Sequence, residues 1–318
     1  MRALLFDGTD ALIRDDYPRP SSVDGEAIIR VLQAGVCGTD LEITRGFMAF
    51  RGVLGHEFVG IVEDAPDPAW VGQRVVGEIN AACGQCATCR AGRPTHCPHR
   101  TTLGIDRRDG VFAEFTRLPL QNLHRVPDEV SDDAAVFVEP LAAAWEILEQ
   151  IHVRPTDRVA LIGAGRLGQL VARVLRLVGC ELVVWARYPS QVARLEPLGV
   201  EVRMQPDYPP AWADVVIEAT GDPSGYAAAR TLVRPRGVIV LKSTYHGAVE
   251  ADLTGAVIHE LTLVGSRCGP FPPALRALAS GLVDVESLID ARYPLAEGLA
   301  ALERAGQPGT MKVLLEIG

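Results

Sequence analysis

The sequence predicts an α/β protein of two domains, one mostly β and one built on a doubly wound parallel sheet. At 318 residues the chain is longer than a single hydrophobic core usually supports. Its first half contains short β-branched segments separated by Gly and Pro. From about residue 141 strand and helix patterns alternate, which is typical of a parallel sheet covered on both faces. We therefore expect one domain at 1–140 and a second at 141–268, followed by a segment of looser pattern at 269–318.

The individual elements are predicted from the spacing of hydrophobic residues and from the Gly and Pro residues that separate the segments. In the first half, strands are expected at 27–32, 58–63 and 74–78. In the second, we expect a helix at 141–151 after Pro140, strands at 158–163, 181–185, 214–219, 237–241 and 260–264, and a helix at 168–178. A helix at 294–305 and a strand at 311–316 close the chain.

One connection in the second half is unusually short. Only about ten residues, rich in proline, separate a strand near 200–203 from the strand that begins at Asp214. An extended chain of this length can still cross the neighbouring strands. We therefore predict a connection without a helix.

Composition limits the partners and the setting. The formal net charge is −9, which argues against a nucleic-acid or anionic-membrane surface. Neither a signal peptide nor an apolar run long enough to span a membrane is evident. Closely spaced cysteines in a long chain favour metal binding over disulfides, and a reducing cytoplasm is the expected setting.

Four cysteines form a compact lobe at about residues 80–100. Cys83, Cys86 and Cys89 are separated by two residues each, and Cys97 follows after seven more. This spacing predicts a closed, tetrahedral structural zinc site. The alternative is an iron–sulfur cluster, but the bacterial-type pattern has three residues before its last cysteine.

A second set of ligands is spread over three segments. Cys37 and the pair His56 and Glu57 lie on Gly-flanked turns, and Glu139 precedes Pro140. A catalytic zinc has three protein ligands and one open position. Cys37, His56 and one carboxylate fit that description, with Glu57 and Glu139 both candidates for the carboxylate. We thus expect two zinc ions per chain.

A glycine-rich turn predicts dinucleotide binding. The turn follows a strand and opens a helix, the context that gives a GxGxxG pattern its meaning. Its residues are Gly163, Ala164, Gly165, Arg166, Leu167 and Gly168. About twenty residues later, NAD-preferring folds place an acid for the ribose 2′-hydroxyl. This chain has Arg187 there and no acid, which favours NADP; the alternatives are a solvated arginine and use of NAD.

In order along the chain, these motifs resemble those of the zinc-containing medium-chain dehydrogenase/reductase family. The resembling segments are 35–40, 55–57, the cysteine lobe, 138–142, 163–168 and 218–221. The resemblance implies a GroES-like catalytic domain, to which residues 269–318 return, and a Rossmann cofactor domain at 141–268. It also implies that Thr39 relays the alcohol proton, that Thr220 contacts the cofactor, and that residues 258–264 pair between subunits of a homodimer or homotetramer.

The resemblance extends to the reaction. Glu139 stands where classical alcohol dehydrogenases have cysteine, as in polyol and sugar dehydrogenases, and Glu42 stands where many members have histidine. We expect a zinc-dependent oxidoreductase that transfers hydride between a secondary alcohol (polyol, sugar or related) and a nicotinamide cofactor, with Cys37, His56, Thr39 and Glu42 as its catalytic residues. Simple aliphatic or amino-alcohols such as threonine are alternative substrates. A non-catalytic nucleotide-binding protein of the same fold is a further alternative, which predicts no metal at Cys37.

Overall fold

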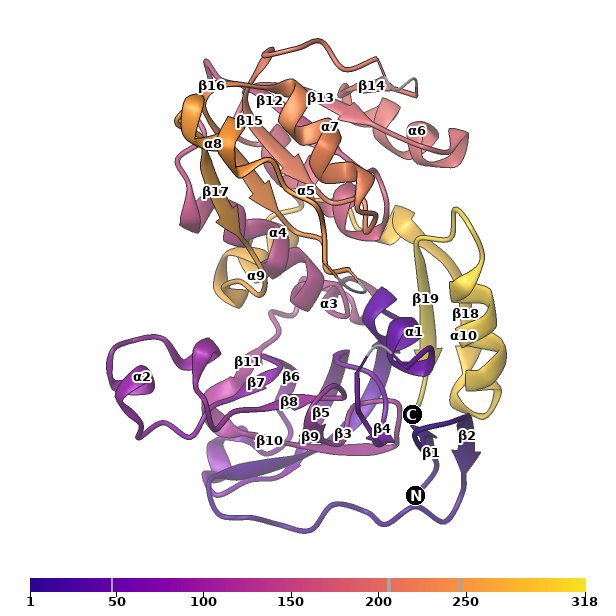
Figure 1. The fold of residues 1–318 in the computed structure, drawn as a ribbon. Helices are drawn as coiled ribbons and strands as arrows, with labels where there is room; N and C mark the ends of the chain where they lie inside the picture. The colour runs from indigo at the N-terminus through magenta and orange to yellow at the C-terminus, as the bar shows by residue number, and fades with distance from the viewer. Residues whose placement is uncertain (47, 205–206, 246–247) are drawn as a thin grey trace. The chain divides into compact units, whose positions relative to one another are not determined.

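Residues 1–46, 48–204, 207–245 and 248–318 are described by the computed structural model (Figure 1). The chain divides into unit 1, Met1–Glu139 with Phe271–Gly318, and unit 2, Pro140–Pro270. None of the described helices has the length and apolarity needed to cross a bilayer.

Unit 1 is built on a seven-stranded sheet in the order β11-β6-β5-β3-β19-β18, with β10 also paired to β3. Two three-stranded sheets, β2-β1-β4 and β7-β8-β9, complete it. The strands are β1 (Ala3–Phe6), β2 (Ala11–Arg14), β3 (Glu26–Gly35), β4 (Gly52–Val53), β5 (Glu57–Asp64), β6 (Arg74–Gly77), β7 (Asn80–Ala81), β8 (Thr101–Leu103), β9 (Arg107–Arg108), β10 (Phe115–Pro119), β11 (Leu123–Arg125), β18 (Ile289–Pro294) and β19 (Lys312–Glu316).

The helices of unit 1 are short. They are α1 (Gly38–Thr44), α2 (Ala87–Arg90), α3 (Asp132–Ala135), α9 (Phe271–Ala279) and α10 (Gly298–Gly306). Single 3₁₀ turns occupy Pro68–Trp70, Pro94–His96, Leu120–Asn122, Glu286–Leu288 and Leu295–Glu297. α10 packs on β18 and β19, so the end of the chain completes the unit that its beginning starts.

Unit 2 is a six-stranded parallel sheet in the order β14-β13-β12-β15-β16-β17 (Figure 1). This is the order of the doubly wound dinucleotide fold, and it confirms the predicted fold class. Its elements are α4 (Val138–Gln150), which begins at the end of unit 1, β12 (Arg158–Ile162), α5 (Arg166–Arg176), β13 (Glu181–Trp185), α6 (Pro189–Leu195), a 3₁₀ turn (Glu196–Leu198), β14 (Glu201–Arg203), β15 (Ala213–Glu218), α7 (Ser224–Leu232), β16 (Val233–Leu241), α8 (Leu253–Ile258) and β17 (Thr262–Gly265).

The helix predicted after Pro140 starts earlier than expected. α4 begins at Val138, so that Pro140 lies inside its first turn. Proline is tolerated there because the first N–H groups of a helix have no intrahelical acceptor. The prediction that Pro140 precedes the helix was therefore wrong by one turn.

The short connection between β14 and β15 has no helix among its described residues, 204 and 207–212, as predicted. Aromatic side chains pack on the sheet there instead. Tyr208 and Trp212 lie with ring centroids 5.6 and 6.4 Å from that of Trp185, at the end of β13. They pack against the core cluster formed by β12, β13, β15, β16 and α7.

Candidate metal and dinucleotide sites

Strand register brings the first ligand set together. β3 pairs with β5 so that Gly35 lies opposite Glu57, and it pairs with β19 so that Gly35 also lies opposite Leu314. The chain leaves β3 at Gly35 and reaches Cys37, which is the N-cap of α1. A Cβ at residue 35 would lie 2.5 Å from Glu57 Oε2, so glycine is needed at this crossing.

The candidate ligand atoms of Cys37, His56 and Glu57 all lie within 4.8 Å of one another. His56 and Glu57 are buried, whereas Cys37 is half-buried. A thiolate, an imidazole and a carboxylate at this spacing are the donor types that zinc takes with one position left open, so these residues fit the metal. Glu139, at the start of α4, is outside this group.

Asp40 links the two turns that carry these ligands. Its carboxylate is fully buried and accepts hydrogen bonds from the Cys37 N–H at 2.8 Å and the Gly55 N–H at 3.3 Å. His56 Nδ1 lies 3.2 Å from Asp40 Oδ1. Burial lowers the pKa of His56, but the opposing effects of Asp40 and Cys37 are larger in sum and hold that pKa well above its ordinary value.

Glu57 is engaged by a second buried ion. The Lys312 ammonium at the start of β19 forms an ion pair with Glu57 Oε2, and both residues are almost completely buried. The ammonium lies 5.2 Å from the centre of the Phe137 ring. One oxygen of Glu57 is thereby held by protein.

The two residues expected to move the proton lie on α1. Thr39 Oγ1 is 3.8 Å from Cys37 Sγ, next to the ligand group. Glu42 forms an ion pair with Arg45 at 2.7 Å, and both of these side chains are partly exposed.

The cysteine lobe has the dimensions of a tetrahedral metal site. The sulfur atoms of Cys83, Cys86, Cys89 and Cys97 lie 3.5 to 4.0 Å apart in the four recorded pairs. Bonds of about 2.3 Å from zinc to sulfur give a tetrahedral edge of about 3.8 Å. The His99 N–H donates to Cys97 Sγ at 3.3 Å, and Cys97 is the buried member of the four. These four thiols therefore fit zinc.

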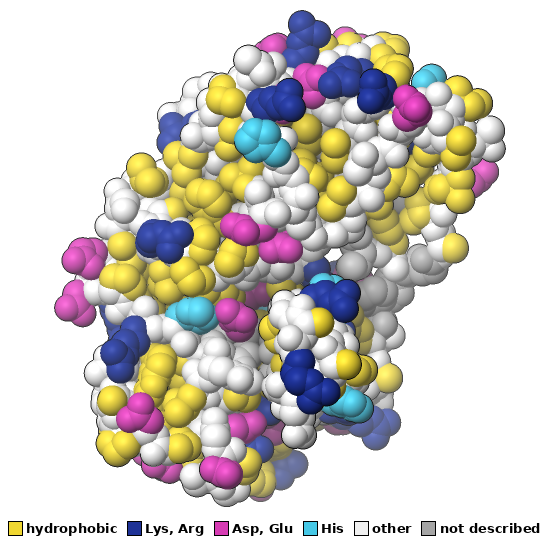
Figure 2. Space-filling model, turned by 90° about the vertical axis from the view of Figure 1, so that its left-hand side faces the viewer, with side chains coloured by type: hydrophobic (Ala, Val, Ile, Leu, Met, Phe, Trp, Pro, Cys, Tyr) yellow, Lys and Arg dark blue, Asp and Glu magenta, His cyan; other side chains and the backbone are white. Residues whose placement is uncertain are grey.

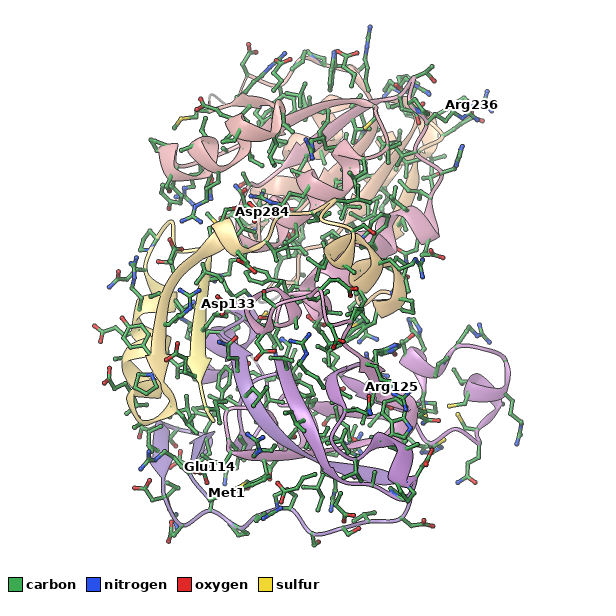
Figure 3. All side chains as sticks on the ribbon, turned by 180° about the vertical axis from the view of Figure 1, so that it is seen from behind. Met1, Glu114, Arg125, Asp133, Arg236 and Asp284 are labelled. Atoms are coloured by element: carbon green, nitrogen blue, oxygen red, sulfur yellow. The ribbon has the colours of Figure 1, made fainter. Side chains whose placement is uncertain are left out.

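The lobe is basic as well as sulfur-rich. It extends away from the strands of unit 1, on the side of the labelled Arg125 (Figure 3), and faces the viewer in Figure 2 with arginine and histidine side chains on its surface. Arg90, Arg93 and Arg100 lie within it, and no Asp or Glu occurs from residue 79 to 105. Four thiolates around a zinc dication would carry excess negative charge, which arginines in the same lobe would partly offset. His96 and His99 are exposed, as expected for surface residues.

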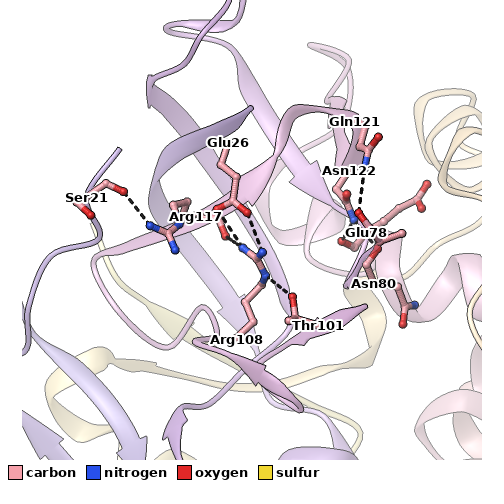
Figure 4. A network of polar contacts seen from close by, with 10 residues as sticks. Ser21, Glu26, Glu78, Asn80, Thr101, Arg108, Arg117, Gln121 and Asn122 are labelled. Carbon is pink, nitrogen blue, oxygen red and sulfur yellow. Dashed lines mark hydrogen bonds and ion pairs between the residues drawn. The ribbon is translucent and has the colours of Figure 1, made fainter. Parts of the chain in front are cut away.

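Polar side chains fix both ends of the lobe (Figure 4). On the entry side, Asn122 Nδ2 donates to the carbonyls of Glu78 at 2.8 Å and Asn80 at 2.9 Å. On the exit side, Arg108 donates to Thr101 Oγ1 at 2.9 Å and pairs with Glu26 at 2.7 Å. Side-chain hydrogen bonds thus hold the chain in place where it enters the lobe and where it leaves it.

In unit 2 the glycine-rich turn has the shape that a pyrophosphate requires. A Cβ at residue 168 would collide with the Gly163 carbonyl, so Gly168 allows α5 to pack closely on β12. Space beside Gly165 is open, and Gly165 is the N-cap of α5. The helix N-terminus therefore presents its N–H groups and positive dipole end to an anion. Gly163 to Gly168 fit a dinucleotide.

Arg187 lies just beyond β13, at the carboxyl edge of the sheet. Its guanidinium is 5.6 Å from the centre of the Tyr188 ring. It also contributes to lowering the pKa of the exposed Asp222, after the larger effect of Ser224. Its backbone N–H is held by Gln191 Oε1 at 2.8 Å.

Thr220 follows β15 and is held by a buried carboxylate. Glu218 Oε1 accepts from the Thr220 N–H at 2.7 Å, from Thr220 Oγ1 at 2.6 Å and from Ser243 Oγ at 3.0 Å. Tyr245 donates to the other oxygen at 2.5 Å; burial and this carboxylate raise the pKa of Tyr245 above its usual value. These hydrogen bonds connect the carboxyl ends of β15 and β16. Doubly wound parallel sheets bind their ligands at this edge.

Three residues of these sites were not expected as functional: Asp40 in its linking role, Lys312 and Glu218. Lys312 had one available signal, since it is one of two lysines among 31 basic residues and interrupts an apolar strand. The contacts of Asp40 and Glu218 depend on tertiary structure, for which the sequence carries no comparable signal.

Comparison with known proteins agrees with this arrangement. Residues 23–128 match the model of the alcohol dehydrogenase GroES-like domain. The chain is 31% identical to 2-dehydro-3-deoxy-L-galactonate 5-dehydrogenase of Pseudoalteromonas atlantica, with 92% of each chain covered.

Two solved structures superpose along nearly the whole chain. A zinc-binding dehydrogenase of Sinorhizobium meliloti bound to NADP has a TM-score of 0.91 at 26% identity, covering 99% of this chain and 98% of the other. An alcohol dehydrogenase of Escherichia coli CFT073 complexed with NADH has a TM-score of 0.90 at 28% identity, covering 99% of each. The metal-ligand geometry, the glycine-rich turn and these similarities agree. The chain belongs to the zinc-containing medium-chain dehydrogenase/reductase family.

Proposed function

We propose that this member of the family interconverts a secondary alcohol of the polyol or sugar type and its ketone, with NADP as the hydride carrier. The observation that carries the proposal is the convergence of Cys37, His56 and Glu57 in unit 1. Unit 2 supplies the sheet and glycine turn for the dinucleotide.

Zinc bound at this site would act as a Lewis acid on the alcohol or carbonyl oxygen. Cys37 and His56 hold it, and Glu57 is the carboxylate that the geometry favours. Glu139 remains the alternative ligand. The zinc content of Glu57→Gln and Glu139→Gln decides between them: we expect the first variant to lose the catalytic zinc and the second to retain it.

The chain's own residues remove the proton. Thr39 stands beside Cys37 in the first turn of α1, where its hydroxyl can accept a proton from the substrate and pass one outward. Glu42, one turn along, assists, and its carboxylate is paired with Arg45 at 2.7 Å. Thr39→Val should lower kcat about 10²- to 10⁴-fold while zinc remains bound.

Arg187 supports the preference for NADP. Its guanidinium can bind a 2′-phosphate through two hydrogen bonds, whereas an acid at this position would repel one. Related structures hold NADP or NADH, so either cofactor fits the fold. The ratio of kcat/KM for the two cofactors tests the assignment, and a strong preference for NAD would contradict it.

The substrate class is tested by screening polyols, aldoses, simple aliphatic alcohols and threonine for NADPH production. We expect the highest kcat/KM among polyols or sugars. Activity confined to aliphatic alcohols or threonine would shift the assignment to that class. No activity, together with a single zinc per chain, would favour the non-catalytic alternative.

We also propose that the chain forms a homodimer or homotetramer in a reducing, cytoplasmic setting. β17 is the last strand in the sheet order of unit 2. Beside it, α8 exposes large apolar side chains, Leu253, Val257 and Ile258. An open strand edge next to an apolar patch supports strand pairing between two copies.

A further inference from the structure

Three buried polar side chains lie behind the dinucleotide loop of unit 2, and the reaction outlined above does not use them. Gln169 and Arg173 belong to α5, and Gln191 belongs to α6; their exposed fractions are 0%, 3% and 6%. Burial of amide and guanidinium groups is costly unless they are hydrogen-bonded. Their hydrogen bonds therefore show which segments of unit 2 these buried side chains connect.

The Gln169 side chain joins two separate segments. Its Nε2 donates to the Ala164 carbonyl in the glycine-rich turn at 3.2 Å and to the Gln191 carbonyl in α6 at 3.1 Å. Its Oε1 accepts from Arg173 at 2.9 Å, and Arg173 also lies 3.5 Å from the Arg194 carbonyl. The Gln169 side chain thus links the glycine-rich turn to α6.

Gln191 extends this linkage to the loop after β13. Its Oε1 accepts from the backbone N–H groups of Arg187 at 2.8 Å and Tyr188 at 3.2 Å. These bonds cap α6 in the manner of a capping-box residue. They also fix the peptide that carries the Arg187 side chain.

We propose that Gln191, supported by Gln169 and Arg173, is a positioning residue that sets the selectivity for NADP over NAD. The inference rests on the proposed role of Arg187. The 2′-phosphate and the pyrophosphate are attached to the same ribose, which limits the distance between them, so both are bound well only if Arg187 lies at a matching distance from the glycine-rich turn. NAD has no 2′-phosphate and does not need that distance.

The test compares cofactor selectivity in Gln191→Met, which keeps the length and bulk of the side chain but removes the acceptor. We expect the ratio of kcat/KM for NADP to that for NAD to fall about five- to tenfold, in line with lost hydrogen bonds. The value for NAD should change less than about twofold. Gln150→Met is the matched control, because this exposed glutamine of α4 donates to the Gly265 carbonyl at 3.2 Å, in neither the glycine-rich turn nor the Arg187 loop. Its ratio should equal that of the wild type.

A double-mutant cycle with Arg187→Ala shows whether Gln191 acts through Arg187. If it does, Arg187→Ala and Arg187→Ala/Gln191→Met will have the same selectivity. Calorimetric binding of adenosine 2′,5′-bisphosphate, which carries both phosphates, and of 5′-AMP, which lacks the 2′-phosphate, gives a second readout that needs neither turnover nor zinc. The single variants should lose affinity for the bisphosphate and keep that for 5′-AMP.

The possible failures can be told apart. An unchanged ratio in Gln191→Met, or an additive further loss in the double variant, overturns the role of Gln191 but leaves the NADP proposal standing. An Arg187→Ala variant with wild-type selectivity overturns both. If Gln191→Met does not fold, Gln191→Asn, whose shorter side chain cannot keep both bonds, carries the test with the same expected direction.

Discussion

At the scale of single residues, Lys312 and Glu57 form a deeply buried ion pair, with side-chain exposures of 4% and 1%. Two ions are costly to remove from water, and only their mutual attraction offsets that cost in a buried pair. The pair also occupies the point where β3, β5 and β19 meet. We therefore expect the loss of this ion pair to change the position of Glu57 in the metal site and to lower the stability of unit 1.

We expect Lys312→Met to lower the free energy of unfolding by about 3–5 kcal/mol, because Glu57 is left as a buried, unpaired charge. Urea denaturation followed by circular dichroism measures the loss. The double variant Lys312→Met/Glu57→Gln should recover most of it. A loss of less than about 1 kcal/mol in the single variant would show that the pair is not desolvated.

A pH-dependent contribution to stability is expected at Asp214. Burial raises the pKa of this carboxyl, but the Arg158 N–H at 2.8 Å and the Arg234 guanidinium at 2.6 Å outweigh burial, and the net shift is downward. A lowered pKa means that the stabilisation is present above the ordinary value of 3.8 and disappears as pH falls through the folded value. The difference in Tm between wild type and Asp214→Asn should therefore shrink below about pH 4. A difference that grows on acidification would contradict this.

Sequence reasoning at this scale predicted the metal-ligand candidates because residue type and spacing carry zinc chemistry. It did not predict the partner of Glu57. Residues 57 and 312 are 255 positions apart, and only the pairing of β3 with both neighbouring strands brings them together. The choice between Glu57 and Glu139 was open for the same reason.

Among the elements, the cysteine lobe depends most on a metal. It has little regular structure beyond α2 and one 3₁₀ turn, and three of its cysteines are only half-buried. Its base, in contrast, is fixed by Asn122 and Arg108. We infer that zinc folds the lobe while the body of unit 1 folds without it.

Cys97→Ser should consequently lose the lobe zinc and make the lobe sensitive to trypsin at Arg90 and Arg100. The rest of unit 1 should resist cleavage. Limited proteolysis with mass spectrometry maps the cut sites. Cys180→Ser, which alters a cysteine outside both ligand sets, is the control; equal resistance of the two variants would refute a zinc-dependent lobe.

The six strands of unit 2 and the helices α4 and α5 were predictable because their periodicity is strong, and so were α10 and the strands β3, β5, β6 and β19 of unit 1. The other strands of unit 1 are mostly short and were missed, as were α1, α2, α3 and α9. The helices α6, α7 and α8 were not predicted. α6 and α8 have seven and six residues, too few for a clear helical period, and α7 begins with Ser224 and Gly225 after Pro223. Packing on the sheet, rather than propensity, therefore stabilises these helices.

At the scale of the whole molecule, the open edge of unit 2 determines assembly in our account. Val257 and Ile258 on α8 are 77% and 70% exposed, and Leu263 on β17 is 38% exposed. Val257→Asp should weaken the association of chains. Light scattering after gel filtration should show a smaller species than the wild type, whereas Leu282→Asp, at an exposed leucine of unit 1, should leave the mass unchanged. A monomeric wild type would contradict this.

The two-part architecture and the reaction class could be derived from the order of motifs along the chain. The substrate could not, because specificity depends on side-chain packing around the site. The buried linkage of Gln169, Arg173 and Gln191 was equally hidden, since polar residues on a helix are normally expected to face water.

The most direct test of the central claim is the zinc content of purified wild type and Cys37→Ser, measured with turnover and dinucleotide binding. The account predicts two zinc ions in the wild type. It predicts one in Cys37→Ser, with turnover abolished and dinucleotide binding kept. A Cys37→Ser protein that retains both zinc ions and appreciable turnover would contradict it.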